Sequence, residues 1–160
     1  MCVIITSFDT QSFGLFFQKR VGQYGSLFNI YKLKTIHPKT QNISKIGRFF
    51  RKSKIDELPQ LFNILNGTMS FVGYRPDIEG YYDTLQGEER KILNLKPGLT
   101  SLASLKYANE EFILAQQKNP LKYNDQIIFP DKVKMNLEYT LNHSFLVDLQ
   151  IILKTLKSIL

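Results

Sequence analysis

The sequence predicts an α+β domain that is dominated by helices and carries one β-hairpin near its N-terminus. Aromatic-rich runs on both sides of a Gly-Gln-Tyr-Gly stretch indicate the hairpin, and apolar residues at helical spacing recur through most of the remaining chain. The chain has 160 residues, of which 43% are hydrophobic and 22% are charged. This length and composition are typical of one globular domain, so we expect residues 1–160 to form a single unit.

Residues 14–36 account for the predicted hairpin. The turn falls at residues 22–25, and the run after it alternates between Leu27, Asn29, Tyr31 and Leu33 on one face and Phe28, Ile30, Lys32 and Lys34 on the other. Such alternation is typical of a strand with two different faces. Lys32 and Lys34 share one of these faces, where they can meet either a phosphate or solvent.

Two short helices are expected after the polar loop at residues 37–42. The first has bases between apolar residues at helical spacing, which are Ile43, Ile46, Phe49 and Phe50. This pattern indicates a basic amphipathic helix. The second begins at Leu58 and ends at Asn66-Gly67.

The rest of the chain predicts extended segments followed by helices. We expect a strand or extended loop over 68–77, mixed helix over 81–95, an extended run over 99–105, and helices over 109–117, 130–143 and 144–160. The last helix carries one apolar stripe, made of Phe145, Leu149, Ile152, Leu156 and Ile159. Such a stripe can pack against a core or lie in a membrane interface.

The charge is positive and unevenly distributed. The formal net charge is +7, and the residues before Asp56 include ten bases but a single acid, Asp9. This excess attracts phosphates on nucleic acid, lipid headgroups or nucleotides, although a solvated basic surface has the same composition. The one cysteine, Cys2, excludes an internal disulfide and a cysteine-based metal cluster.

The stretch "KIDELPQLFN" at residues 54–63 has two interpretations. In a structural one, Asp56 is an N-cap, Glu57 complements the helix dipole, and Pro59 lies in the first turn. In a chemical one, one carboxylate binds Mg²⁺ while the other attacks phosphorus, kept ionised by the neighbouring bases. The bases around it favour the chemical interpretation; they are Arg48, Arg51, Lys52, Lys54 and, further on, Arg75.

Five segments in order give the sequence a family resemblance. They are "FFQKRVG" (16–22), "FNIYKLKT" (28–35), "IGRFFRKSKIDELPQLFNILNGTMSFVGYRPD" (46–77), "LKPGLTS" (95–101) and "LEYTLNHSFLVDLQIILKT" (137–155). With them the sequence resembles the monotopic bacterial phosphoglycosyl transferases, the sugar-1-phosphate transferases that initiate capsule, exopolysaccharide and glycoprotein assembly. The resemblance covers nearly the whole chain.

The resemblance implies transfer of a sugar-1-phosphate from a UDP-sugar to polyprenyl (undecaprenyl) phosphate, with release of UMP. It implies that Asp56 is the catalytic nucleophile, which forms a covalent phosphosugar, and that Glu57 is the Mg²⁺ ligand. Arg51 and Arg75 match arginines that the family places near the phosphates, a role that suits a planar guanidinium. It also implies a place on the cytoplasmic face of the bacterial inner membrane and no nucleic-acid partner.

Three positions depart from the family pattern. Relatives begin with a re-entrant membrane helix, and residues 2–9 match only its tail, so the resemblance implies a catalytic domain truncated at its N-terminal anchor. Tyr74-Arg75-Pro76 replaces Pro-Arg-Pro. Lys106 lies where many relatives carry an arginine, and it can bind phosphate as a point charge but not as a fork.

Asp77 and Asp131 stand beside prolines, where turn or cap roles are the first expectation, and either could join the metal shell.

Two other functions stay open at this stage. Residues 32–54 could form a nonenzymatic basic module for anionic lipid or nucleic acid, with Asp56 and Glu57 serving only to start a helix. The chain could also be an inactive truncated relative. The sequence identifies neither the sugar nor the oligomeric state.

Overall fold

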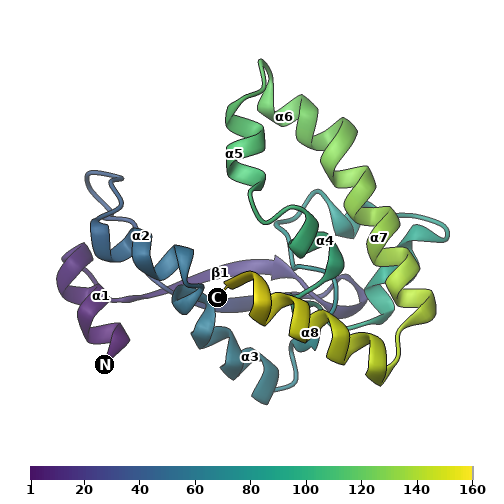
Figure 1. Ribbon diagram of the computed structural model, residues 1–160, viewed down its shortest axis with the longest axis horizontal. Coiled ribbons are helices and arrows are strands. Elements are labelled where there is room, and N and C mark those ends of the chain that lie inside the picture. Colours follow the sequence, from purple (N-terminus) through teal and green to yellow (C-terminus); the bar gives the residue numbers. More distant parts are fainter. Residues whose placement is uncertain (160) are drawn as a thin grey trace.

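The computed structural model describes residues 1–159, with side chains through residue 158. Figure 1 shows the hairpin running through the middle of the molecule, with helices α1 and α2 toward one end and α4, α7 and α8 toward the other. The helices are α1 (Cys2–Thr10), α2 (Lys45–Lys52), α3 (Leu61–Leu65), α4 (Leu102–Lys106), α5 (Glu110–Ala115), α6 (Pro120–Tyr123), α7 (Phe129–Asn142) and α8 (Phe145–Ile159). The helix-dominated α+β prediction is confirmed.

The predicted hairpin is present. Strand β1 (Leu15–Val21) pairs antiparallel with β2 (Leu27–Leu33), in a register that sets Phe17 opposite Tyr31. The turn between them includes a short 3₁₀ helix, η1 (Gln23–Gly25), in which Tyr24 and Gly25 have left-handed φ values of 59° and 81°. Glycine adopts this conformation without strain, so Gly25 suits the tighter bend of the chain.

A second, smaller sheet joins β3 (Ser70–Val72) to β4 (Gly98–Thr100) in parallel. Gly73 and Gly98 let the two backbones approach closely, because a Cβ on Gly98 would lie 2.1 Å from the Gly73 nitrogen. The prediction of an extended run over 99–105 is wrong from residue 102 onward. Ser101 begins α4 there as an N-cap, since its hydroxyl accepts a hydrogen bond of 2.9 Å from the Ser104 amide.

The connection between β3 and β4 includes two 3₁₀ helices, η3 (Tyr82–Thr84) and η4 (Glu89–Asn94). They pack with α7 around the first of two apolar clusters, which contains Val21, Tyr74, Tyr82, Leu85, Ile92, Leu93 and Val133. The Tyr74 and Tyr82 rings lie 4.9 Å apart, and the Tyr82 hydroxyl accepts a hydrogen bond from Asn136 of α7. This packing anchors the backbone on which Arg75 follows Tyr74.

Helices α5, α7 and α8 confirm the predictions for 109–117, 130–143 and 144–160. A short helix not predicted from the sequence, α6, leads through a π-helical turn, η5 (Asn124–Ile128), into α7. A single continuous helical path therefore connects the tip of the α5–α6 arm to the core. None of the helices among residues 1–159 is both long and apolar enough to cross a bilayer.

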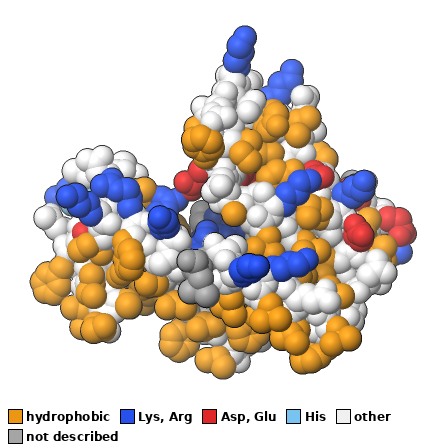
Figure 2. Space-filling model, viewed as in Figure 1, with side chains coloured by type: hydrophobic (Ala, Val, Ile, Leu, Met, Phe, Trp, Pro, Cys, Tyr) orange, Lys and Arg blue, Asp and Glu red, His pale blue; other side chains and the backbone are white. Residues whose placement is uncertain are grey.

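Helix α8 leaves most of its predicted apolar stripe uncovered. Ile151 is buried in the second apolar cluster with Val72 and Tyr139, and Val147 and Ile152 pack against that cluster. Phe145, Leu149 and Leu156 are exposed, together with Leu146 and Leu153; the Ile159 side chain lies outside the described residues. Figure 2 shows hydrophobic side chains gathered along the lower edge of the molecule, with Lys and Arg side chains above them.

The segment after α2, residues 55–65, is turned so that its polar side faces the protein, and it is called the inverted segment below. It consists of the 3₁₀ helix η2 (Ile55–Gln60) followed by α3. Gln60 and Asn63 are only 2% and 1% exposed, whereas Phe62 and Leu65 are 65% and 81% exposed. The apolar residues that predicted this helix therefore cover little of the core.

Asn63 fastens this inverted segment to the hairpin. Its side-chain oxygen accepts a hydrogen bond from the Tyr31 amide at 3.1 Å, and its amide nitrogen donates to the Asn29 carbonyl at 2.8 Å. Both backbone groups belong to β2, on the edge that does not pair with β1. One buried side chain thus takes the place of a neighbouring strand at this position.

We expect Asn63→Ala to lower the free energy of unfolding by about 2 kcal/mol, because it leaves an amide and a carbonyl of β2 without partners. Asn142→Ala is the matched control, since exposed Asn142 bonds only within α7 and should cost under about 0.5 kcal/mol. Urea unfolding of both variants measures the difference. Equal costs would show that the Asn63 bonds do not fasten the segment.

Candidate active site

Helix η2 carries the Asp-Glu pair. A left-handed backbone conformation at the preceding residue, without a side-chain cap, marks where the helix begins. Ser44 caps the N-terminus of α2, where its hydroxyl accepts a hydrogen bond from the Gly47 amide, and the helix ends at Lys52. Lys54 then adopts a left-handed φ of 57° and precedes η2, so Asp56 and Glu57 lie in its first turn. The interpretation of Asp56 as an N-cap is wrong, and Pro59 lies in the second turn of η2 rather than the first.

Glu57 is buried and bound by two cations from other parts of the chain. Arg75, on the loop after β3, donates from Nη2 to Oε1 at 2.5 Å and from Nη1 to Oε2 at 3.3 Å. Lys32 of β2 lies 3.4 Å from Oε1. Burial alone would raise the pKa of Glu57, but Arg75, with further help from Lys32 and Lys54, lowers it to about 2. Glu57 is therefore ionised at neutral pH.

Asp56 has the opposite environment. Its Oδ1 atom is buried without a hydrogen-bond partner among the described residues. Burial is the main cause that raises the pKa of this carboxyl, and the charge of Glu57 raises it further, against the attraction of Lys32, Lys54 and Arg51. The neighbouring bases favour the ionised form of Asp56, as expected, but desolvation outweighs them and makes the carboxylate more basic. The result is a more basic carboxylate beside one that is fully ionised.

The two cations on Glu57 have capacity left for an anion. A guanidinium has five N–H donors, and Arg75 uses two of them on Glu57 while its side chain stays partly exposed. Burial lowers the pKa of the Lys32 ammonium, and the nearby charge of Arg75 lowers it further. The charges of Glu57 and Asp56 oppose this shift. Neighbouring cations that repel one another favour the arrival of an additional anion.

Arg51 lies near the pair but is joined to a different element. It donates from Nη2 to Glu111 of α5 at 2.6 Å, and this ion pair connects α2 to the α5–α6 arm. Because both side chains are solvent-accessible, the pair adds little stability. Arg51 can therefore exchange Glu111 for another anion at small cost.

Lys34 and Lys106 are not joined to the Asp-Glu pair. Lys34 has no ion pair among the described residues, and Lys106 lies 2.7 Å from Oδ2 of Asp131. The hydrogen bonds from Lys106 and Tyr107 lower the pKa of Asp131. Asp131 thus has a charge partner rather than a turn role, while Asp77 accepts from Arg20 at 3.2 Å and from the Ile78 amide.

Three contributors to the site were missed from the sequence. Asn63 bonds the edge of β2, and Gln60 ends η2 with an amide nitrogen that is buried without a partner among the described residues. Glu110 of α5, which pairs with Lys132 at 2.6 Å, is near enough to Arg75 to raise its pKa. Buried polar residues at every third position of an otherwise apolar helix were the available signal, at residues 57, 60 and 63.

The described residues contain no cluster of three or more His, Cys, Asp or Glu side chains that could hold a metal by themselves. A carboxylate pair is nevertheless sufficient for Mg²⁺, which usually keeps several waters and takes one or two carboxylates plus phosphate oxygens. The unpartnered Asp56 oxygen beside Glu57 fits such a site, although Arg75 and Lys32 occupy three of the four lone-pair positions on Glu57.

Fold and site together define a small α+β domain with a carboxylate pair in a cationic, phosphate-attracting setting. The family model for bacterial sugar transferases matches residues 1–160. The chain belongs to the bacterial sugar transferase family.

Relatives with specific names support this membership. The chain is 31% identical to the galactosyl transferase CpsE of Streptococcus agalactiae and 32% identical to the UDP-glucose:undecaprenyl-phosphate glucose-1-phosphate transferase of Caulobacter vibrioides, each over 91% of this chain. It is 28% identical over 89% of its length to the undecaprenyl-phosphate galactose phosphotransferase of Salmonella typhimurium. It spans 34%, 56% and 32% of these three relatives, respectively.

Neutralising Asp56 and neutralising Glu57 should change the free energy of unfolding in opposite directions. Asp56→Asn removes a charge that the fold disfavours, so we expect more stable protein at pH 7. Glu57→Gln leaves Arg75 and Lys32 without their counter-charge and should cost about 2 to 3 kcal/mol, allowing for the partial exposure of Arg75. Urea unfolding of the two variants and the parent at pH 7 provides the comparison, and a shared sign would contradict it.

The pH dependence follows from the same pKa values. The pKa of Glu57 is about 2 in the folded chain and ordinarily 4.5. The contribution of its charge to the free energy of unfolding is therefore complete above pH 4.5 and is lost as the pH falls toward 2. The deficit of Glu57→Gln should therefore shrink over that interval. A deficit that is constant between pH 5 and pH 3 would show that it has another cause.

Proposed function

We propose that this domain transfers a sugar-1-phosphate from a UDP-sugar to polyprenyl phosphate, with undecaprenyl phosphate as the acceptor and UMP as the released product. The observation that carries the proposal is the basic Asp56 carboxylate, with an unpartnered oxygen, beside a Glu57 that binds two cations. The names of the Caulobacter and Salmonella relatives support the choice of acceptor.

In the first half of the proposed reaction, an Asp56 carboxylate oxygen attacks the β-phosphorus of the UDP-sugar. The bond between that phosphorus and the bridging oxygen of UMP breaks, and the bridging oxygen takes the electron pair. Asp56 then carries the sugar phosphate as an acyl phosphate ester, and UMP departs. Because burial raises the basicity of Asp56, the carboxylate is a stronger nucleophile than a solvated one.

In the second half, a phosphate oxygen of the polyprenyl phosphate attacks the same phosphorus. The bond to Asp56 breaks, its oxygen recovers the electron pair, and the lipid-linked diphosphate sugar leaves. The ionised Asp56 is restored without a net proton change. Among the described residues, no hydrogen-bond donor reduces the nucleophilicity of its Oδ1.

Cations on the protein orient the phosphates in this scheme. Arg75 holds Glu57 with two N–H groups, which leaves the others for phosphate oxygens, and Lys32 adds a point charge from β2. Arg51 would join them by leaving Glu111. Lys106, paired with Asp131, and Lys34 are more distant candidates for the same role.

Glu57 would hold Mg²⁺ together with donor phosphate oxygens, and Asp56 is the adjacent second carboxylate. When bound, the ion supplies charge neutralisation of the diphosphate, which lowers repulsion of the attacking carboxylate. The two protein cations on Glu57 oppose tight binding of a further cation in the absence of donor. We therefore expect the affinity for Mg²⁺ to rise when the nucleotide sugar is present.

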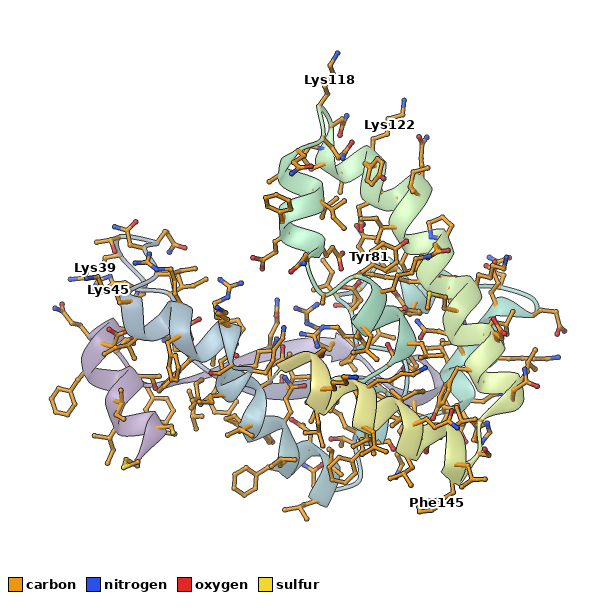
Figure 3. All side chains as sticks on the ribbon, in the orientation of Figure 1. Lys39, Lys45, Tyr81, Lys118, Lys122 and Phe145 are labelled. Atoms are coloured by element: carbon orange, nitrogen blue, oxygen red, sulfur yellow. The ribbon has the colours of Figure 1, made fainter. Side chains whose placement is uncertain are left out.

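The exposed apolar edge suits a place at the cytoplasmic surface of the membrane. Helix α8 contributes Phe145, Leu146 and Leu153 to this edge, and α3 contributes Phe62 and Leu65. Figure 3 shows Phe145 at the lower edge and Lys118 and Lys122 at the opposite tip, on the α5–α6 arm. An apolar face with bases above it is typical of segments that lie in a membrane interface.

The function is tested by UMP release from a panel of UDP-sugars with undecaprenyl phosphate and Mg²⁺. We expect Asp56→Asn to abolish turnover and intact-mass analysis of the parent to show a sugar-phosphate adduct before acceptor is added. The activity should fall at a higher pH than the ordinary aspartate pKa of 3.8 because protonated Asp56 is not a nucleophile. A nonenzymatic module or an inactive relative would release no UMP with any donor.

The membrane surface is tested by flotation with vesicles that contain anionic lipid. Leu146→Glu should weaken binding roughly tenfold or more, because it places a charge among apolar contacts. Leu121→Glu is the matched control, since Leu121 on the arm and Leu146 are similarly exposed, at 65% and 68%. Equal weakening by both substitutions would count against the lower edge as the membrane surface.

A further inference from the structure

An apolar groove lies on the side of the hairpin that faces away from Lys32. It has a volume of about 620 Å³, and its lining includes Val3 of α1, Leu15, Phe17 and Tyr31 of the hairpin, and Pro59 and Phe62 of the inverted segment. This volume is within the range of about 300–1,000 Å³ that is usual for small-molecule sites. Nearly all the lining is hydrocarbon or aromatic, so the groove does not suit a sugar or a nucleotide.

The groove opens onto the apolar edge of the molecule. Phe17, Phe62 and Leu65 line it and are themselves more than half exposed. The inversion of η2 and α3 produces this opening, because it turns the apolar side of α3 outward and leaves Pro59 on the groove wall. An apolar chain can therefore enter from a membrane surface along Phe17, Phe62 and Leu65, with Asn66 as a polar lining residue beside them.

The other end of the groove adjoins the Asp-Glu pair through the backbone. Pro59 is three residues from Asp56 in the same 3₁₀ helix, a separation of about 6 Å along the axis at roughly 2 Å per residue. Tyr31, which lies edge-to-face with Phe17 at 5.5 Å, immediately precedes Lys32 on β2. Each wall of the groove thus leads within a few residues to a group of the charged site.

We propose that this groove binds the first isoprene units of the polyprenyl phosphate, with the phosphate directed along η2 from Pro59 toward Asp56. The inference rests on the proposed function, which supplies an acceptor with an anionic head and an apolar chain. Charge complementarity favours this occupant, because Asp56 at the η2 end lies near the charges of Lys32, Lys54 and Arg51, while the opening lies at the exposed apolar edge. A phospholipid acyl chain is the alternative that the experiment must separate.

The first test compares two phenylalanines of similar exposure. Phe62, 65% exposed, lines the groove, whereas Phe71, 51% exposed, is not among the lining residues. We expect Phe62→Ala to raise the KM for a water-soluble two-isoprene phosphate about tenfold relative to that for the UDP-sugar, since it removes apolar contact with the first isoprene units. Phe71→Ala should leave this ratio unchanged. An unchanged ratio in Phe62→Ala overturns the proposal.

The second test needs no turnover. A photoreactive isoprenyl phosphate is irradiated with the full chain in bilayer discs, and the modified peptides are identified by mass spectrometry. Adducts in residues 59–66 or at Tyr31, reduced by undecaprenyl phosphate but not by phosphatidylglycerol, support the assignment. Adducts elsewhere, or equal competition by phosphatidylglycerol, overturn it.

The two proposals fail separately in these experiments. If no UDP-sugar releases UMP but the adducts fall in the groove, the proposed reaction fails and the chain-binding site stands. If UMP is released with long-chain acceptor but the adducts and the Phe62→Ala ratio show no use of the groove, the reaction stands and this site does not.

Discussion

The contact of buried Glu57 with Arg75 and Lys32 joins three segments that are far apart in the sequence. A buried carboxylate is retained in the charged form only where cations and hydrogen bonds replace its lost water. Here the replacement comes from the hairpin and from the loop after β3, at 3.4 Å and 2.5 Å. Each segment must be correctly folded for the charge to be compensated, so the site assembles only when the two sheets are in place.

This constraint explains why η2 and α3 are turned with their polar side inward. Glu57 has to face Lys32 and Arg75, and Gln60 and Asn63 follow at three-residue steps on the same side. Asn63 then bonds the free edge of β2, which holds η2 beside Lys32. The apolar side of the segment is left outward, where an aqueous protein would bear a cost and where a protein at a membrane surface gains contact with lipid.

Asp56 is disfavoured as a charged group in the folded chain, and the proposed reaction would use the features that disfavour it. Its carboxylate is partly desolvated, lies beside a like charge, and has an oxygen that finds no partner within the part of the chain that the structure describes. Each of these features opposes ionisation in the folded chain, and each makes the ionised form more reactive toward an electrophile. The well-compensated Glu57 next to it supplies the stability that Asp56 does not. The two adjacent carboxylates therefore differ in basicity through their environments alone.

Local sequence determined a large part of this protein. The hairpin follows from strand alternation around a glycine turn, the helices follow from apolar spacing, and the identity of the Asp-Glu pair with its bases follows from the motif. These features depend on neighbours within a few residues, so their physical causes are contained in short segments. The family resemblance drew on the same short segments, and the family match covers the same chain.

Tertiary structure alone decided which way those elements face. Periodicity states that a helix has an apolar side but not whether a core, a groove or a membrane covers it, so the orientations of α3 and α8 could not be read from their spacing. Burial likewise sets the balance between desolvation and attraction that raises the pKa of Asp56 and lowers that of Glu57. The partners of Lys106 and Arg51, which are Asp131 and Glu111, depend on packing between distant helices for the same reason.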